Sequence, residues 1–182
     1  VKFADGFPEY TRYGYLKFDL SGITSVTGAK VRLYLFSSKD ADTHTLKKLN
    51  TNDWKETGIT CKNRPTDAGP TIDSWSVGTN GWKEVDITQE AMDAIGGELS
   101  FLIEASGNNL AKYHSKENTE GAEYNPEIVI IDTAGSVTSS YKGQQVVVAD
   151  VSFMPNPVTN GVCSAYVKGI GNNEKVRLNL YN

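Results

Sequence analysis

The sequence predicts an all-β protein, a sandwich or barrel of short strands. Stretches that alternate between apolar and polar residues recur along the chain. Gly, Asn, Asp and Pro interrupt them, as at Thr79-Asn80-Gly81 and Asn63-Arg64-Pro65. Only one stretch, 88–95, reads as a helix. Many short strands with almost no helix are typical of β-sandwiches and barrels.

The first two strands are the clearest, and they are predicted at 13–20 and 29–37. Their inward residues are Leu16, Phe18, Leu20, Val31, Leu33 and Leu35. Their outward residues are Tyr15, Lys17, Asp19, Lys30, Arg32 and Tyr34. Further strands are expected at 44–49, 82–87, 99–105, 110–116 and 127–132. The helix is expected to begin with Thr88 as its N-cap and to end at Gly96-Gly97.

The composition changes after Ile131-Asp132. Residues 133–145 are small, polar and nearly uncharged, which predicts a linker. Beyond them, 146–182 alternates again and turns at 154–157, which predicts a small β segment with strands at 146–153 and 175–181. The chain therefore divides into a domain over 1–132, the linker 133–145 and the C-terminal segment 146–182.

Charge and composition narrow the function classes. The 182 residues carry a formal net charge of −4, which argues against nucleic acid as a partner. No apolar run is long enough to span a membrane. Cys61 and Cys163 lack a His or a second Cys at metal-ligand spacing, so zinc is not predicted. Any site for an anionic polymer must therefore be a local patch on an acidic body.

Outward cations and phenols are the candidate binding residues. Lys17 and Arg32, framed by Tyr15 and Tyr34, are expected to share one sheet face, because they lie on consecutive strands with the same parity. Phenols stack on sugar rings, and cations bind carboxylate or sulfate. The alternative is an ordinary solvated face stabilised by cross-strand pairs.

Residues outside these two strands complete the candidate set. His114 and Lys116 are expected to point outward from a later strand. Trp75, in the Ser/Thr/Gly-rich stretch 74–81, is expected in a loop with little to cover it, where it could stack on a sugar. Trp54 and Trp82 are interpreted as packing residues.

Two catalytic functions are alternatives to glycan binding. His114 with Tyr15, Lys17 and Arg32 could supply the base and the carboxylate neutraliser of a small polysaccharide lyase. Glu84 and Asp86 share a strand face and could suggest a glycosidase or a structural calcium ion, although carboxylates opposite Lys or Arg are the commoner arrangement. No other cofactor is predicted.

Several motifs in order resemble a known family. They are YLKFDLS at 15–21, AKVRLY at 29–34, WKETGITCKNRP at 54–65, WKEVDIT at 82–88, LSFLI at 99–103, SKE at 115–117 and NPEIVI at 125–130. Together they resemble the DNRLRE-type domain, family 96 of the carbohydrate-binding modules, over residues 1–132. The resemblance implies a jelly-roll sandwich that binds an acidic, alginate-like polysaccharide and is attached to a lyase or a cell-surface protein. It also implies a first strand before Val1.

The C-terminal segment resembles a second family. VSFMPNPVTNG at 151–161 and EKVRLNLYN at 174–182 resemble the sorting domain of type IX secretion substrates. This implies export by the secretion machinery of a Bacteroidetes-type bacterium, to the cell surface or the medium. The sequence thus favours a non-catalytic binding module. A structural or adhesion spacer is the main alternative, and a small lyase the lesser one.

Overall fold

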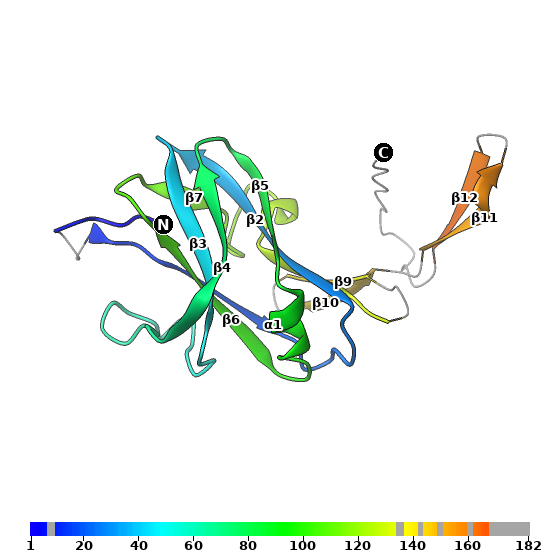
Figure 1. Cartoon of the computed structure of the whole chain (residues 1–182), viewed down its shortest axis with the longest axis horizontal. Helices are drawn as coiled ribbons and strands as arrows, with labels where there is room; N and C mark the ends of the chain where they lie inside the picture. The colour runs from blue at the N-terminus through cyan, green and yellow to red at the C-terminus, as the bar shows by residue number, and fades with distance from the viewer. Residues whose placement is uncertain (7–9, 134–136, 142–143, 149–150, 160–161, 168–182) are drawn as a thin grey trace.

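Two antiparallel sheets form the body of the protein, which confirms the predicted all-β sandwich (Figure 1), and a third, two-stranded sheet follows near the C-terminus. The computed structural model describes residues 1–6, 10–133, 137–141, 144–148, 151–159 and 162–167, with side chains described up to residue 133 and at Val137. Strand pairing, which no single stretch of sequence specifies, assigns each strand to its sheet.

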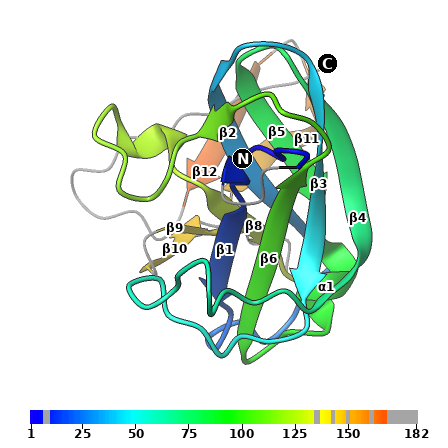
Figure 2. The ribbon, with the colours of Figure 1, turned by 90° about the vertical axis from the view of Figure 1, so that its left-hand side faces the viewer.

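The first sheet has four strands in the order β1-β6-β3-β4 (Figure 2). They are β1 (Gly14–Asp19), β6 (Glu98–Ala105), β3 (Asp42–Leu49) and β4 (Ala68–Val77). Within the described strands, β1 pairs only with β6, so β1 forms one edge of this sheet and β4 the other. Pro70 lies in β4, where an edge strand tolerates the missing N–H.

The second sheet has six strands in the order β10-β9-β8-β2-β5, with the short β7 also paired to β2. They are β10 (Gln144–Val148), β9 (Val137–Tyr141), β8 (Glu127–Ile131), β2 (Gly28–Ser38), β5 (Gly81–Asp86) and β7 (Ala111–Tyr113). The alternation in β2 is borne out, because Val31, Leu33 and Leu35 are buried and the residues between them are half-buried.

The hydrophobic core lies between the two sheets. Its largest fully buried members come from both of them and from the connections, and include Phe101, Leu20, Leu33, Leu46, Ile87, Leu99 and Ile128. Each strand contributes residues two apart, because successive side chains point to opposite faces. The side chains on the outer face of each sheet therefore lie outside this core and can contact loops or ligands.

Helix α1 (Thr88–Met92) is shorter than predicted and begins differently. Thr88 is not its N-cap. Its hydroxyl instead accepts a hydrogen bond from the N–H of Ala29 at 3.0 Å, which joins the helix to β2. The helix is followed by Gly96, whose positive φ of 76° suits glycine.

Two sequence expectations about connections differ from the structure. Residues 133–145, predicted to be a linker, contain β9, which continues the second sheet by pairing with β8. Strand pairing uses main-chain hydrogen bonds, which small polar residues can make as well. Residues 74–77, expected in a loop, belong to β4.

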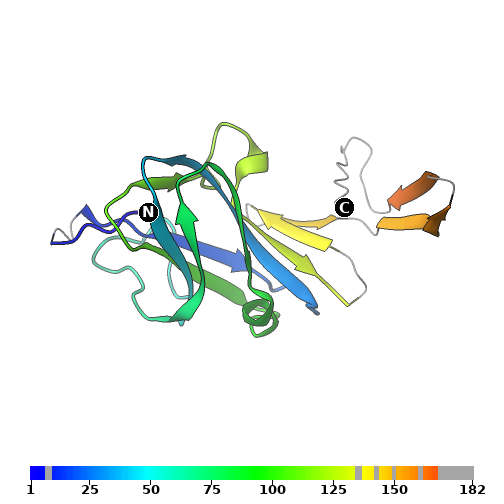
Figure 3. The same ribbon diagram turned by 45° about the horizontal axis from the view of Figure 1, so that its top comes forward.

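The C-terminal segment forms a sheet of its own in part. β11 (Val151–Thr159) pairs with β12 (Val162–Val167) in a two-stranded sheet (Figure 3). Residues 144–148, however, belong to β10 of the larger sheet, so the expected strand 146–153 is divided between two sheets. The expected strand at 175–181 lies outside the described residues.

Candidate functional site

The two predicted cations lie on different sheets, so the expectation that they share a face is wrong. Lys17 is on β1 and faces Ser100 of β6, whereas Arg32 is on β2 between Glu84 and Glu127. Both side chains point outward, as their parity requires, but the outer faces of a sandwich look in opposite directions. Tyr15 goes with Lys17, and Tyr34 goes with Arg32.

Lys17 holds a long connection against the first sheet. Its ammonium donates to the main-chain oxygens of Asn52 at 2.6 Å and Trp54 at 2.7 Å, and it lies 5.0 Å from the centroid of the Trp54 ring. The Trp54 indole N–H in turn donates to Ser100 Oγ at 3.1 Å. The Tyr15 hydroxyl donates to the oxygen of Pro65 at 3.0 Å. The loop 50–67 is thereby fixed over β1 and β6.

Replacing Lys17 with Met should lower the free energy of unfolding by about 1–3 kcal/mol, because two main-chain oxygens lose a charged donor. Replacing Lys30 with Met is the matched control. Its ammonium makes an exposed ion pair with Glu84 at 2.6 Å, and such pairs contribute about 0–1 kcal/mol. Urea denaturation of both variants measures the difference. Equal losses would contradict the structural role of Lys17.

A cleft of about 1010 Å³ opens beside the β1 edge of the sandwich. Its walls come from β1, from β7 and the residues after it, and from the loop that Lys17 holds. Four of the predicted site residues line it: Tyr15, Lys17, His114 and Lys116. Tyr13, Trp54 and Tyr113 add aromatic surface to the walls. The structure therefore brings together more than half of the predicted set at one place.

The cleft is basic although the whole chain is acidic. Its basic lining residues are Arg12, Lys17, Lys55, Lys112 and Lys116, and its acidic ones are Asp19 and Glu56. Lys55 and Lys112 are exposed, and no ion pair joins either of them to another described residue. These two ammonium groups can meet an anion without first breaking an internal bond.

Lys116 and His114 have different roles in the cleft wall. Ion pairs with Glu117 at 2.9 Å and Glu56 at 2.8 Å raise the pKa of Lys116, so its charge is kept. His114 is buried rather than outward, which corrects the sequence expectation. Its ring lies 4.4 Å from that of Phe36 and stacks on Tyr124, and its Nε2 is 3.6 Å from a Glu120 oxygen.

The second face carries Arg32 and Tyr34. The Arg32 guanidinium lies 4.2 Å from the centroid of the Trp82 ring and donates to Glu84 and Glu127. The Tyr34 ring is 5.3 Å from the same indole. The sequence predicts Trp82 to be a packing residue, yet it is half-buried on this outer face, as its parity with Glu84 in the strand indicates.

Trp75 is not available to a ligand, which corrects the sequence expectation. It lies in β4, its side chain is buried, and its indole N–H donates to the Tyr113 hydroxyl at 2.9 Å. Its neighbours alternate with it as Ser74-Trp75-Ser76-Val77, a short strand signal in a stretch that otherwise looks like a loop.

The residue set considered for a lyase is not assembled. Arg32 lies on the opposite sheet from Tyr15 and Lys17, and the Lys17 ammonium is bound to two main-chain oxygens. Glu84 pairs with Lys30 and Arg32 across strands, and Asp86 accepts the N–H of Thr88 at 2.9 Å. Both carboxylates thus have the structural partners expected of surface residues.

In the part of the chain that the structure describes, no three His, Cys, Asp or Glu side chains are grouped to hold a metal ion, and the structural calcium ion considered from sequence stays a prediction. No helix in that part is long and apolar enough to cross a membrane.

Comparison with known proteins finds a family that covers most of the chain. The family model described as carbohydrate-binding module family 96 matches residues 1–132, which spans β1 to β8 and every residue of the cleft. No curated protein matches the chain. The match covers most of the chain and confirms the resemblance drawn from its motifs; the chain belongs to carbohydrate-binding module family 96.

Proposed function

We propose that this carbohydrate-binding module recognises an acidic, alginate-like polysaccharide in the cleft beside β1. The charge of the cleft carries the proposal, since five basic and two acidic side chains line it in a chain of net charge −4. A uronate chain presents one carboxylate per residue, and charge-assisted bonds from ammonium groups suit that spacing of charge. The aromatic walls offer ring faces for the C–H surface of the sugar.

The arrangement supports binding without chemistry on the glycan. The exposed cations Lys55 and Lys112 come from the loop and from β7, and both line the cleft. The loop is held in place by Lys17 and Trp54, so the wall is preformed and less ordering entropy is lost on binding.

Reversing the charge of Lys55 and Lys112 together should weaken alginate binding at least tenfold, because two attractive contacts become repulsive. The matched control reverses Lys39 and Lys62, which are exposed, lie outside the cleft lining and change the net charge equally. Affinity electrophoresis with alginate, pectate and a sulfated glycan at low salt measures both variants. Binding should also weaken as salt rises through the screening range.

Two results would reject the proposal. One is no retardation of the unmodified protein by any of the three acidic polymers. The other is equal loss in the cleft variant and in the Lys39 and Lys62 control, which would mean that only net charge matters. A structural spacer, the alternative reading, predicts the first of these.

We propose further that the module serves a secreted or surface-attached polysaccharide-degrading protein, as its non-catalytic part. Membership of a family of carbohydrate-binding modules supports this. The motifs at 151–161 and 174–182 support export through the type IX machinery, with the C-terminal segment as the recognised element.

A further inference from the structure

A second aromatic surface lies on the outer face of the six-stranded sheet and adjoins the cleft at His114, which lines the cleft and stacks on Tyr124. Tyr34 of β2 faces Trp82 of β5 in the strand register, with ring centroids 5.3 Å apart. Tyr124, from the short 3₁₀ helix η2 (Ala122–Tyr124), brings a third ring to 4.6 Å from Tyr34. All three rings are half-buried, so each keeps part of its surface open. We call these three residues with Arg32 the aromatic face.

The aromatic face rests on a rigid base. The inward residues Val31, Leu33 and Val85 of the same two strands are at most 1% exposed, so β2 and β5 are fixed on the core. His114 stacks on Tyr124 with centroids 5.5 Å apart and an interplanar angle of 23°. A platform whose rings are already ordered loses little entropy when a ligand stacks on it.

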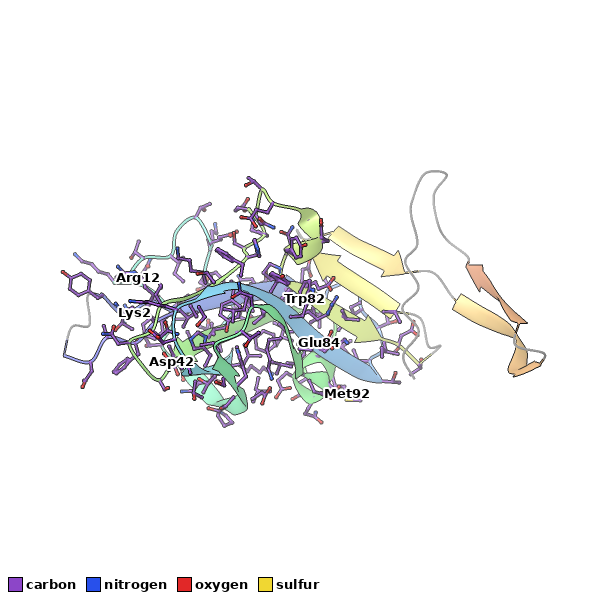
Figure 4. All side chains as sticks on the ribbon, turned by 90° about the horizontal axis from the view of Figure 1, so that it is seen from above. Lys2, Arg12, Asp42, Trp82, Glu84 and Met92 are labelled. Carbon is purple, nitrogen blue, oxygen red and sulfur yellow. The ribbon has the colours of Figure 1, made fainter. Side chains whose placement is uncertain are left out.

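Its charges are balanced within the protein. Arg32 lies over Trp82 and is bonded by Glu84, at 2.7 Å from Nε, and by Glu127. Lys30 bonds to Glu84 at 2.6 Å, next to the Arg32 contact. Burial alone would raise the pKa of Glu84, but the ion pairs with Lys30 and Arg32 lower it overall, so this carboxylate is ionised at neutral pH. Figure 4 shows Trp82 and Glu84 along β5.

This charge balance distinguishes the aromatic face from the cleft, where basic residues outnumber acidic ones. Two cations, Lys30 and Arg32, meet two carboxylates, Glu84 and Glu127, and neither cation is left over for an anion. An acidic polymer would have to displace an internal carboxylate from Arg32. A neutral sugar would not, because its hydroxyl groups can donate to carboxylate oxygens and accept from the guanidinium while those pairs persist.

We propose that the aromatic face is a second glycan-binding site and that its ligand is a neutral pyranose chain. The C–H faces of the sugars stack on Trp82, Tyr34 and Tyr124, and the paired charges beside them bind hydroxyl groups. The module then has two surfaces of different specificity, one for acidic and one for neutral chains. A polymer or cell wall that holds both kinds of chain would be bound with added avidity.

Soluble mixed-linkage β-glucan, galactomannan and xyloglucan are suitable neutral probes in affinity electrophoresis. We expect at least one to retard the protein, with retardation nearly unchanged between low and high salt. Trp82→Ala and Tyr124→Ala should each weaken that binding about tenfold or more. Tyr124 lies outside the sheet, so its variant tests the site even if Trp82→Ala fails to fold, as a thermal melt would show.

The charge-reversed cleft variant of Lys55 and Lys112 distinguishes the two sites. It should bind the neutral probe as the unmodified protein does, while losing alginate. The inference is overturned if none of the three neutral polymers retards the protein, if Tyr124→Ala leaves retardation unchanged, or if the cleft variant loses neutral binding as well. Failure of alginate binding alone would reject only the cleft site.

Discussion

Replacing Trp75 with Ala is expected to lower the free energy of unfolding by about 3–5 kcal/mol, the range for large aromatic residues removed from a core. Trp75 is 8% exposed and packs in the core from β4. Its loss would also leave the Tyr113 hydroxyl without the indole donor at 2.9 Å. Chemical denaturation followed by circular dichroism measures the change, and a loss below about 1 kcal/mol would contradict the buried position.

Trp75→Phe provides the matched control. It keeps most of the apolar surface and loses the hydrogen bond, so the destabilisation should be smaller than that of Ala. Glycan affinity should stay unchanged in Trp75→Phe, provided that the protein is folded. The sequence interpretation of Trp75 as a sugar-stacking residue requires the opposite, a loss of affinity at unchanged stability.

Acid is expected to destabilise the protein through His44, by about 3 kcal/mol between neutral pH and pH 4. His44 is fully buried in β3, and burial is the main cause that lowers its pKa to about 4. Its Nδ1 lies 2.9 Å from the Tyr113 hydroxyl. No other acceptor for the Tyr113 O–H is found among the described residues, so this hydroxyl is assigned as the donor to Nδ1, which places the proton of neutral His44 on Nε2.

The pH window follows from the two pKa values of His44. In the unfolded chain the imidazole binds a proton below about pH 6.5, whereas in the folded protein it does so only below about pH 4. Between these values the unfolded state binds more protons, so stability falls as pH falls, by about 1.4 kcal/mol per pH unit. The contribution of His44 is complete above pH 6.5 and is lost toward pH 4.

His44→Gln tests this origin of the acid sensitivity. The variant is expected to be less stable than the unmodified protein at pH 7, and the gap should narrow steadily toward pH 4. Urea denaturation at half-unit steps of pH measures it. A gap that stays constant over this range would mean that His44 does not titrate between the two states, since the carboxylates and His114 are common to both proteins.

Local alternation predicted the strands and their faces well. The strands expected at 13–20, 29–37 and 99–105 are β1, β2 and β6, with the inward and outward residues of β1 and β2 as expected. A strand has a period of two, so burial of every second residue appears in the sequence as alternating apolar and polar residues. The edge strand β4 is not predicted from sequence, because most of it is polar or contains Pro70. Apolar and polar residues alternate only at its end, around Trp75 and Val77.

The sequence by itself determined the all-β class, the family and the outward direction of Lys17 and Arg32. Only the tertiary structure decided that these two cations lie on opposite faces, because the choice of pairing partner depends on residues far apart in the chain: β1 pairs with β6, and β2 with β5 and β8. It also placed Lys55 and Lys112 on one cleft and Tyr34, Trp82 and Tyr124 on one face. Such clusters form only when separate segments pack together, so they cannot be predicted from the pattern of any one stretch of sequence.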